Sequence, residues 1–216
     1  MNITWHGQGM IKIIGKTDLP VTIVVDPFSE RETGLRPPRP EADAILISSD
    51  RPESANIDTI QGQPVIINSA GEYDVKGVTV RGIPSYHDAE QGKKYGDNTI
   101  FLIQFEGMSL CHLGCLGHAL SERQIDDIGD CDVLFVPIGG DRTMDTKTAI
   151  EVINKIEPRM VVPTHYAIPK LKYKLAPVGA FLKEMGVAQA APEPRLKLKK
   201  SDLPGEETRV VLLAKE

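Results

Sequence analysis

The chain has 216 residues, of which 41% are hydrophobic and 25% are charged, with a net charge of -5. This length suits one domain, which we place over residues 1–216, and it can bury a large core without disulfides. The acidic balance argues against a nucleic-acid partner, which would favour a basic surface, and no apolar run is long enough to cross a membrane.

The cysteines predict a reducing compartment. There are three, Cys111, Cys115 and Cys131, and this odd number does not form the pattern of a disulfide framework. The first residues enter a strand pattern directly, without the charged and apolar regions of a signal peptide. We therefore expect free thiols and a cytoplasmic location.

The first half of the chain is predicted to form short strands, because its apolar segments are β-branched and separated by turn residues. A proline-rich stretch, Arg36–Pro40, must be an extended surface loop. The polar stretch from Tyr86 to Asn98 is long enough to indicate a functional loop. The expected strands are 3–5, 10–14, 21–25, 44–47, 65–67, 78–82, 99–105 and 108–112.

The second half alternates between strands and helices. Ser121 and Gln124 have the spacing of a capping box, which predicts a helix running to about Ile128. Further helices are expected over 145–156 and 177–185, and strands over 132–136, 159–163, 196–199 and 209–214. The chain has strands in its first half and alternating strands and helices in its second half. This order favours two packed sheets with outer helices over a simple parallel α/β sheet.

Seven short motifs, met in order along the chain, resemble those of the ascorbate-6-phosphate-lactonase-like branch of the metallo-β-lactamase fold. The resemblance implies an α/β (α+β) architecture, a four-layer αββα sandwich with metal ions bound at one edge. The motifs are Ile3–Gly7, Val25–Pro27, Gly71–Asp74, Tyr86–Asp88 with Asn98–Ile100, His112–His118, Val136–Gly140 and Pro163–Tyr166.

The family's metal signature is His-x-His-x-Asp-His, followed later by a His, an Asp and a final His. Such ligands hold divalent ions that activate a bound water. Only two of the seven positions keep their residue type here. Serine is a poor zinc ligand and arginine cannot ligate a metal, so the first metal site is predicted to be lost and the signature to be degenerate. The residues at the seven positions are Ser49, Arg51, Glu53, Ser54, His87, Cys115 and His165.

One hypothesis keeps a single zinc ion. Glu53, Cys115 and His165 would bind it, and His87 beside them would orient the substrate. The chain would then be a metal-dependent hydrolase of a lactone or a phosphate ester, by analogy with the family.

A second hypothesis needs no metal. An Arg51 guanidinium ~5 Å from a zinc ion would repel it by about 7 kcal/mol at an effective dielectric of ~20. Arg51 would more naturally pair with Glu53. Arg51, His87 and His165 would then bind a small anion such as a phosphate or a carboxylate.

A third hypothesis is a purely structural role, because a fold does not by itself imply an activity. Under any of the three hypotheses, exposed strand edges favour pairing, so a homo-oligomer is expected. The cofactor is accordingly none or one zinc ion. Asp26, Asp88 and Asp141 lie in expected loops and are assigned no catalytic role.

Overall fold

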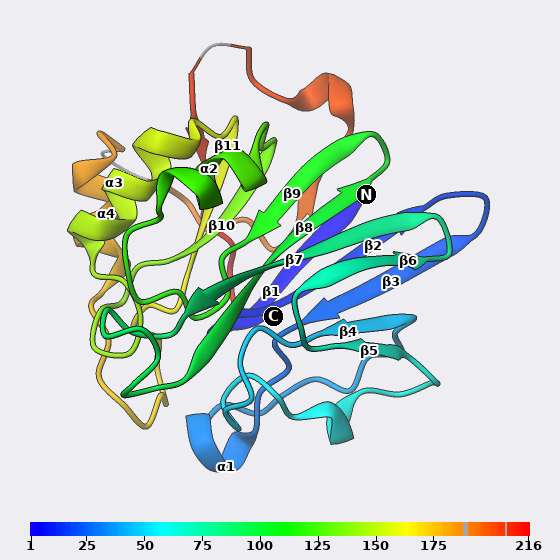
Figure 1. Ribbon diagram of the computed structural model, residues 1–216, viewed down its shortest axis with the longest axis horizontal. Coiled ribbons are helices and arrows are strands. Elements are labelled where there is room, and N and C mark those ends of the chain that lie inside the picture. The colour runs from blue at the N-terminus through cyan, green and yellow to red at the C-terminus, as the bar shows by residue number, and fades with distance from the viewer. Residues whose placement is uncertain (188–189, 206) are drawn as a thin grey trace.

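Two β-sheets pack face to face in the computed structural model, which describes residues 1–187, 190–205 and 207–216 (Figure 1). The first sheet has the order β12-β1-β2-β3-β4-β5. Its strands are β1 (Asn2–Gly7), β2 (Met10–Lys16), β3 (Pro20–Val25), β4 (Ala44–Leu46), β5 (Val65–Ile67) and β12 (Leu196–Lys197).

The second sheet has the order β13-β11-β10-β9-β8-β7-β6. Its antiparallel half is a meander of β6 to β9, and its other half pairs β9, β10, β11 and β13 in parallel. The strands are β6 (Gly71–Val75), β7 (Val78–Tyr86), β8 (Asp97–Phe105), β9 (Met108–His112), β10 (Val133–Pro137), β11 (Met160–Thr164) and β13 (Arg209–Val210).

The alternation of side chains along the strands divides the apolar residues between two cores. In β2, Ile11 and Ile13 belong to the large cluster between the sheets, whereas Met10 belongs to a small cluster with Phe28. This follows from the period of two in a strand, which sends successive side chains to opposite faces. Both faces of the first sheet are therefore covered.

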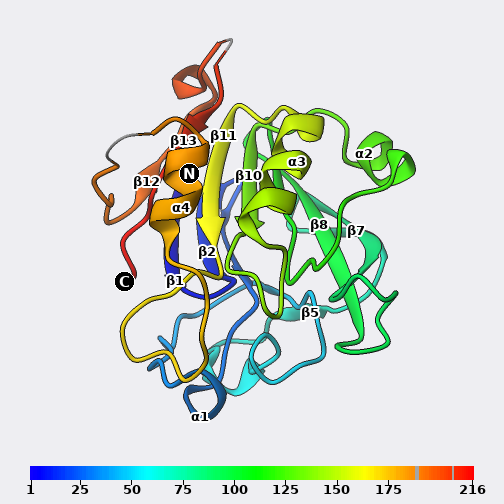
Figure 2. The same cartoon turned by 90° about the vertical axis from the view of Figure 1, so that its left-hand side faces the viewer.

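Three helices cover the second sheet on the side away from the first sheet (Figure 2). They are α2 (Glu122–Ile128), α3 (Thr146–Ile156) and α4 (Val178–Glu184). The Ser121 and Gln124 capping box that begins α2 is present as predicted. The layer outside the first sheet is thinner, with the four-residue α1 (Glu30–Thr33) and the 3-10 turn η1 (Ile57–Thr59); a second 3-10 turn is η2 (Lys200–Asp202).

The predicted two-sheet architecture is confirmed, with three local differences. The strand β6 was not expected, because at the sheet edge it carries exposed Glu72 and Asp74 in place of an apolar run. The helix α1 was not expected either, since four residues carry no periodicity. The last strand β13 stops at Val210, and the chain continues only through single bridges such as Glu193 with Leu213. Among the described residues no helix is long and apolar enough to cross a bilayer.

Candidate functional site

The carboxyl ends of four strands meet at one edge of the sandwich and bring the predicted site residues together. Ser49 follows β4, His87 follows β7, Cys115 follows β9 and His165 follows β11. All four side chains are buried, with exposed fractions of 1–6%. The topology therefore gathers residues that are far apart in the sequence, as the family resemblance predicted.

Glu53 lies between two arginines at the mouth of this site. Its Oε1 accepts a hydrogen bond from Arg51 Nε at 2.8 Å and another from Arg142 Nη1 at 2.9 Å. Burial alone would raise the pKa of the Glu53 carboxyl, but the bond from Arg51 and the charges of both arginines lower it below its ordinary value. The predicted pairing of Arg51 with Glu53 is confirmed, and we call the three residues the arginine clamp.

Each arginine of the clamp rests on a tyrosine. The Arg51 guanidinium lies 5.4 Å from the centre of the Tyr95 ring, and that of Arg142 lies 4.8 Å from the centre of the Tyr173 ring. Such cation–π contacts fix the planes of the guanidinium groups. Burial raises the pKa of Tyr173, whose hydroxyl donates to Gln8 Oε1 at 3.0 Å. Tyr95 in the 88–95 loop therefore supports one arginine of the clamp, and Tyr173 in the segment after β11 supports the other.

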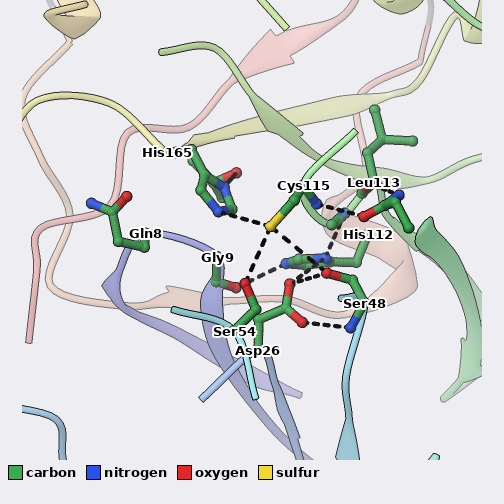
Figure 3. A network of polar contacts seen from close by, with 12 residues as sticks. Gln8, Gly9, Asp26, Ser48, Ser54, His112, Leu113, Cys115 and His165 are labelled. Atoms are coloured by element: carbon green, nitrogen blue, oxygen red, sulfur yellow. Dashed lines mark hydrogen bonds and ion pairs between the residues drawn. The ribbon is translucent and has the colours of Figure 1, made fainter. Parts of the chain in front are cut away.

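Cys115 lies at the centre of a buried polar network (Figure 3). Its Sγ is 3.2 Å from Ser54 Oγ and 3.6 Å from His165 Nε2. Burial raises the pKa of the Cys115 thiol to about 12, with the charge of Asp26 acting in the same direction. Burial also lowers the pKa of His165 to about 3. The pair therefore consists of a neutral thiol and a neutral imidazole at neutral pH.

His87 is likewise neutral. Burial lowers the pKa of its imidazole to about 4, and the positive charge of Arg51 acts in the same direction. Its Nδ1 lies 3.5 Å from Ser49 Oγ. A buried neutral imidazole supplies no net charge to an anion, so the positive charge at this site comes from the arginines.

The loop beside His87 is organised by one carboxylate. The two oxygens of Asp88 accept hydrogen bonds from the backbone N–H groups of Glu90, Gly92, Lys94 and Tyr95, at 2.7–3.0 Å. These four bonds fold the 88–95 loop into a compact turn. Asp88 therefore has a structural role, and its loop places the Tyr95 ring beneath Arg51.

The deepest part of the network contains Asp26, which the sequence placed in a loop near the site without a catalytic role. Both of its carboxylate oxygens accept from Ser48, one from the backbone N–H and one from Oγ, each at 2.7 Å. Burial raises the pKa of Asp26 to about 7. The Gly114 N–H donates to His112 Nδ1, so His112 carries its proton on Nε2, which donates to the Gly9 carbonyl.

The family implies metal ions at this edge, but the donor set does not fit them. Glu53 is bonded to two guanidinium groups, and the first-metal positions carry a serine and an arginine. Across residues 1–187, 190–205 and 207–216, no three His, Cys, Asp or Glu side chains are placed to hold one ion together. Cys115 and His165 are neighbours, but among the described residues no third donor completes a tetrahedral site around them.

A cavity of about 880 Å³ adjoins the site on the side of β7 and α2. Ser49 and Tyr86 line it, together with His118. His118 Nε2 accepts from the Tyr86 backbone N–H and its Nδ1 lies 2.7 Å from the Ala119 carbonyl, so this histidine links the end of β7 to the turn before α2. The arginine clamp does not line this cavity; it lies at the surface beside it.

Sequence reasoning missed three contributors: Arg142, Tyr173 and Gln8. Arg142 follows Gly139–Gly140 in a loop whose path cannot be inferred from local pattern, and Tyr173 lies in a segment without helix or strand periodicity. The sequence offered no signal for these three residues, because the burial of Glu53, which favours a second charged partner, is visible only in the structure.

A two-sheet sandwich with buried polar residues at the carboxyl ends of its strands is the architecture of the metallo-β-lactamase class. Residues 2–165 match the model of the Beta-lactamase superfamily domain, so the chain belongs to this family. The chain is 30% identical to a Thermotoga maritima protein assigned to the metallo-beta-lactamase superfamily, with a TM-score of 0.78 and 99% of each chain covered.

Other relatives are named as metal-dependent hydrolases. A UPF0173 metal-dependent hydrolase of Thermoplasma acidophilum is 26% identical over 190 residues, covering 77% of this chain and 83% of the relative. A metallo hydrolase of Ignicoccus hospitalis shares the fold with a TM-score of 0.61 at 19% identity, covering 92% of this chain and 99% of the other. The comparisons establish the family and name no substrate.

Proposed function

We propose that this member of the family binds an anionic small molecule at the arginine clamp and does not carry out dinuclear metal-dependent hydrolysis. The observation that carries the proposal is the sharing of one Glu53 oxygen by Arg51 and Arg142. Two positive groups facing one negative group leave a positive charge at the mouth of the site.

The geometry of the clamp supports an anion with two or more oxygens. Arg51 uses its Nε and Arg142 uses one Nη for Glu53, so the remaining N–H groups of each guanidinium are available to a ligand. Both side chains are about one-third exposed, at 34% and 33%. Guanidinium groups bind carboxylates and phosphates through paired N–H donors, and the stacking on tyrosine reduces the entropy lost on binding.

The predicted ligand set of Arg51, His87 and His165 is revised in this proposal. His87 and His165 are buried and neutral, and Arg142 supplies the second charge.

A single-zinc hydrolase is the second candidate. The neighbouring thiol of Cys115 and imidazole of His165, 3.6 Å apart, are ligands that zinc favours. For this candidate Glu53 must leave both arginines to become the third ligand. That rearrangement would break both hydrogen bonds that Glu53 accepts and would leave two guanidinium charges beside the metal ion, which they would repel.

The test combines metal analysis with calorimetry. Protein purified without chelator or affinity tag is analysed by plasma mass spectrometry, and inorganic phosphate is then titrated into it. We expect phosphate binding that weakens at least tenfold in Arg142→Gln and is restored in part in Arg142→Lys. Arg123→Gln is the matched control, because Arg123 is 93% exposed and its only ion pair among the described residues is a distant 3.9 Å contact with Asp127.

Two results would contradict the proposal. One is the absence of phosphate binding in the native chain. The other is about one zinc ion per chain that is lost in Cys115→Ala, which would establish the single-zinc site instead.

A further inference from the structure

The cavity of about 880 Å³ beside the site has an acidic wall. Its volume falls within the roughly 300–1,000 Å³ that is usual for small-molecule sites. Among the described residues Arg123 is the only lysine or arginine that lines it, whereas four carboxylates line it from four different segments. These are Asp50 after β4, Asp88 after β7, Asp97 at the start of β8 and Asp127 on α2. The lining therefore has an excess of three negative charges.

The charged residues next to the lining do not reverse this balance. Within two positions of a lining residue along the chain there are three cations and four further carboxylates. The cations are Arg51, Arg81 and Lys93, and the carboxylates are Glu72, Glu90, Glu122 and Asp126. Arg51 donates to Glu53 and lies over Tyr95, so its charge is engaged at the clamp. The cavity thus attracts cations, whereas the neighbouring clamp attracts anions.

The fold supplies few cationic partners to the lining carboxylates. Asp50 and Asp97 are exposed, and their side chains form no ion pair or hydrogen bond with any residue that the structure describes. Asp127 contacts Arg123 Nε only at 3.9 Å, in an exposed pair that contributes little. Asp88 is bonded to backbone N–H groups of its own loop and to no cation. Negative charge is therefore available to a ligand.

Two further lining side chains have unused binding capacity. Thr99 on β8 is only 8% exposed, and its hydroxyl forms no hydrogen bond within the described parts of the chain. The enclosed side-chain atoms that lack a partner there belong to residues that do not line the cavity, so the Thr99 hydroxyl opens into it. Tyr86 is 39% exposed, with its ring centre 5.9 Å from that of His118. A buried acceptor and an open aromatic ring suit an ammonium group and its methylene chain.

The histidine on this wall contributes no charge. His118 Nε2 accepts from the Tyr86 backbone N–H, so its proton is on Nδ1, which donates to the Ala119 carbonyl. An imidazole that accepts a hydrogen bond at one nitrogen is neutral. The excess of negative charge in the lining is therefore not offset by this ring.

The arrangement of the carboxylates also indicates which kind of cation fits. In the parts of the chain that the structure describes, no three His, Cys, Asp or Glu side chains are placed to hold one metal ion. Carboxylates on separate elements suit a cation whose charges are spread along a chain. A neutral polyol would leave the excess negative charge uncompensated. The lining therefore favours an extended organic cation over a metal ion or a polyol.

We propose that this cavity binds a linear aliphatic polyamine, with ammonium groups at Asp50 and Asp127 and methylene groups against the Tyr86 ring. Thr99 accepts a further hydrogen bond from an ammonium N–H. Carboxylates bind ammonium groups through charge-assisted hydrogen bonds, and the aromatic ring adds a cation–π contact. The proposal is independent of anion binding at the clamp, because no residue of the clamp lines the cavity.

The experiment is calorimetric titration of the full chain at one ionic strength. Putrescine, spermidine and spermine carry an increasing number of ammonium groups, and magnesium chloride and triethylene glycol are the comparison ligands. The test variant is Asp50→Asn/Asp127→Asn. The control is Asp126→Asn/Asp130→Asn, which removes the same charge from exposed positions on and beside α2 that do not line the cavity. A third variant, Arg123→Gln, removes the cation from the lining.

We expect affinity to increase from putrescine to spermine, and Mg²⁺ to bind more weakly than putrescine, which has the same charge. Spermine binding should weaken roughly tenfold in Asp50→Asn/Asp127→Asn, because two exposed ion pairs are lost. In Arg123→Gln it should tighten by about twofold, because a like charge is removed. A gain in affinity cannot result from unfolding. Asp126→Asn/Asp130→Asn should bind spermine as the native chain does.

Four results would overturn the proposal. The first is an absence of spermine binding to the native chain. The second is an equal loss in Asp126→Asn/Asp130→Asn, which would reduce the effect to the net charge of an acidic chain. Tighter binding of Mg²⁺ than of putrescine would assign the carboxylates to a metal ion. Binding of triethylene glycol as tight as that of spermidine would assign the cavity to neutral ligands.

Discussion

At the scale of single residues, Glu53 decides what this edge of the molecule can do. Its carboxylate is bonded to Arg51 and Arg142, and a carboxylate engaged in this way is not free to ligate a metal. Sequence reasoning predicted the pairing with Arg51, because a guanidinium beside a metal ion would be repelled and would pair with a carboxylate instead. It could not predict the bond from Arg142, because that contact spans 89 residues and depends on the path of the loop after β10.

Replacement of Glu53 tests the clamp directly. Glu53→Gln should lower the free energy of unfolding by about 1 kcal/mol, since both guanidinium groups are one-third exposed and water screens them. The folded-state pKa of Glu53 lies below its ordinary value of 4.5, so its stabilising effect is present above that pH and is lost as the pH falls. Urea unfolding of the native chain and of Glu53→Gln across this pH range should show that their free energies of unfolding converge in acid. A difference independent of pH would mean that Glu53 acts through packing alone.

At the scale of elements, the polar stretch from Tyr86 to Asn98 was predicted to be a functional loop because of its length, and the structure has a loop of residues 87–96 between β7 and β8. The Asp88 carboxylate accepts four backbone hydrogen bonds, and the loop presents Tyr95 to Arg51. Which loop residue would do this could not be predicted, because Asp, Asn and Ser all form such turns.

Removal of the Asp88 carboxylate should loosen the loop without unfolding the protein. In Asp88→Ala the four N–H groups lose their acceptor, so amide hydrogen exchange should accelerate within residues 89–95 while β8 and β9 stay protected. Phosphate affinity at the clamp should fall, because Tyr95 no longer supports Arg51. Asp97→Ala, an exposed change at the start of β8, is the matched control. Unchanged exchange in the loop would show that the backbone turn is stable by itself.

At the scale of the whole molecule, burial leaves four histidines neutral in the fold. Burial lowers the pKa values of His6, His87 and His112 to about 4, and that of His165 to about 3. Sequence reasoning placed His87 and His165 at the site, but the sign and size of these shifts depend on burial, which only the packed structure provides. The alternation of apolar residues predicted the two sheets well, since burial between sheets dictates that pattern.

These histidines make the stability of the fold dependent on pH. The unfolded chain binds protons near pH 6.5, whereas the folded chain binds them only near pH 3–4. The free energy of unfolding should therefore fall as the pH is lowered through this window. Asp26 has the opposite effect on stability, because its raised pKa of about 7 means that the folded chain binds this proton more tightly than the unfolded chain does. The four histidines together change the free energy of unfolding more than this one carboxyl group. Urea unfolding between pH 7 and pH 4 measures the result, and constant stability would contradict the predicted burial of neutral imidazoles.

The arginine clamp also has a consequence for how the protein matures. A metal centre that joins loops from several strands is complete only after an ion has been delivered, so the final state depends on supply and on competing proteins. The bridge through Glu53 joins the loop after β4 to the loop after β10 with side chains alone. If the clamp works as proposed, this end of the molecule is complete once the chain has folded, without the delivery of a metal ion.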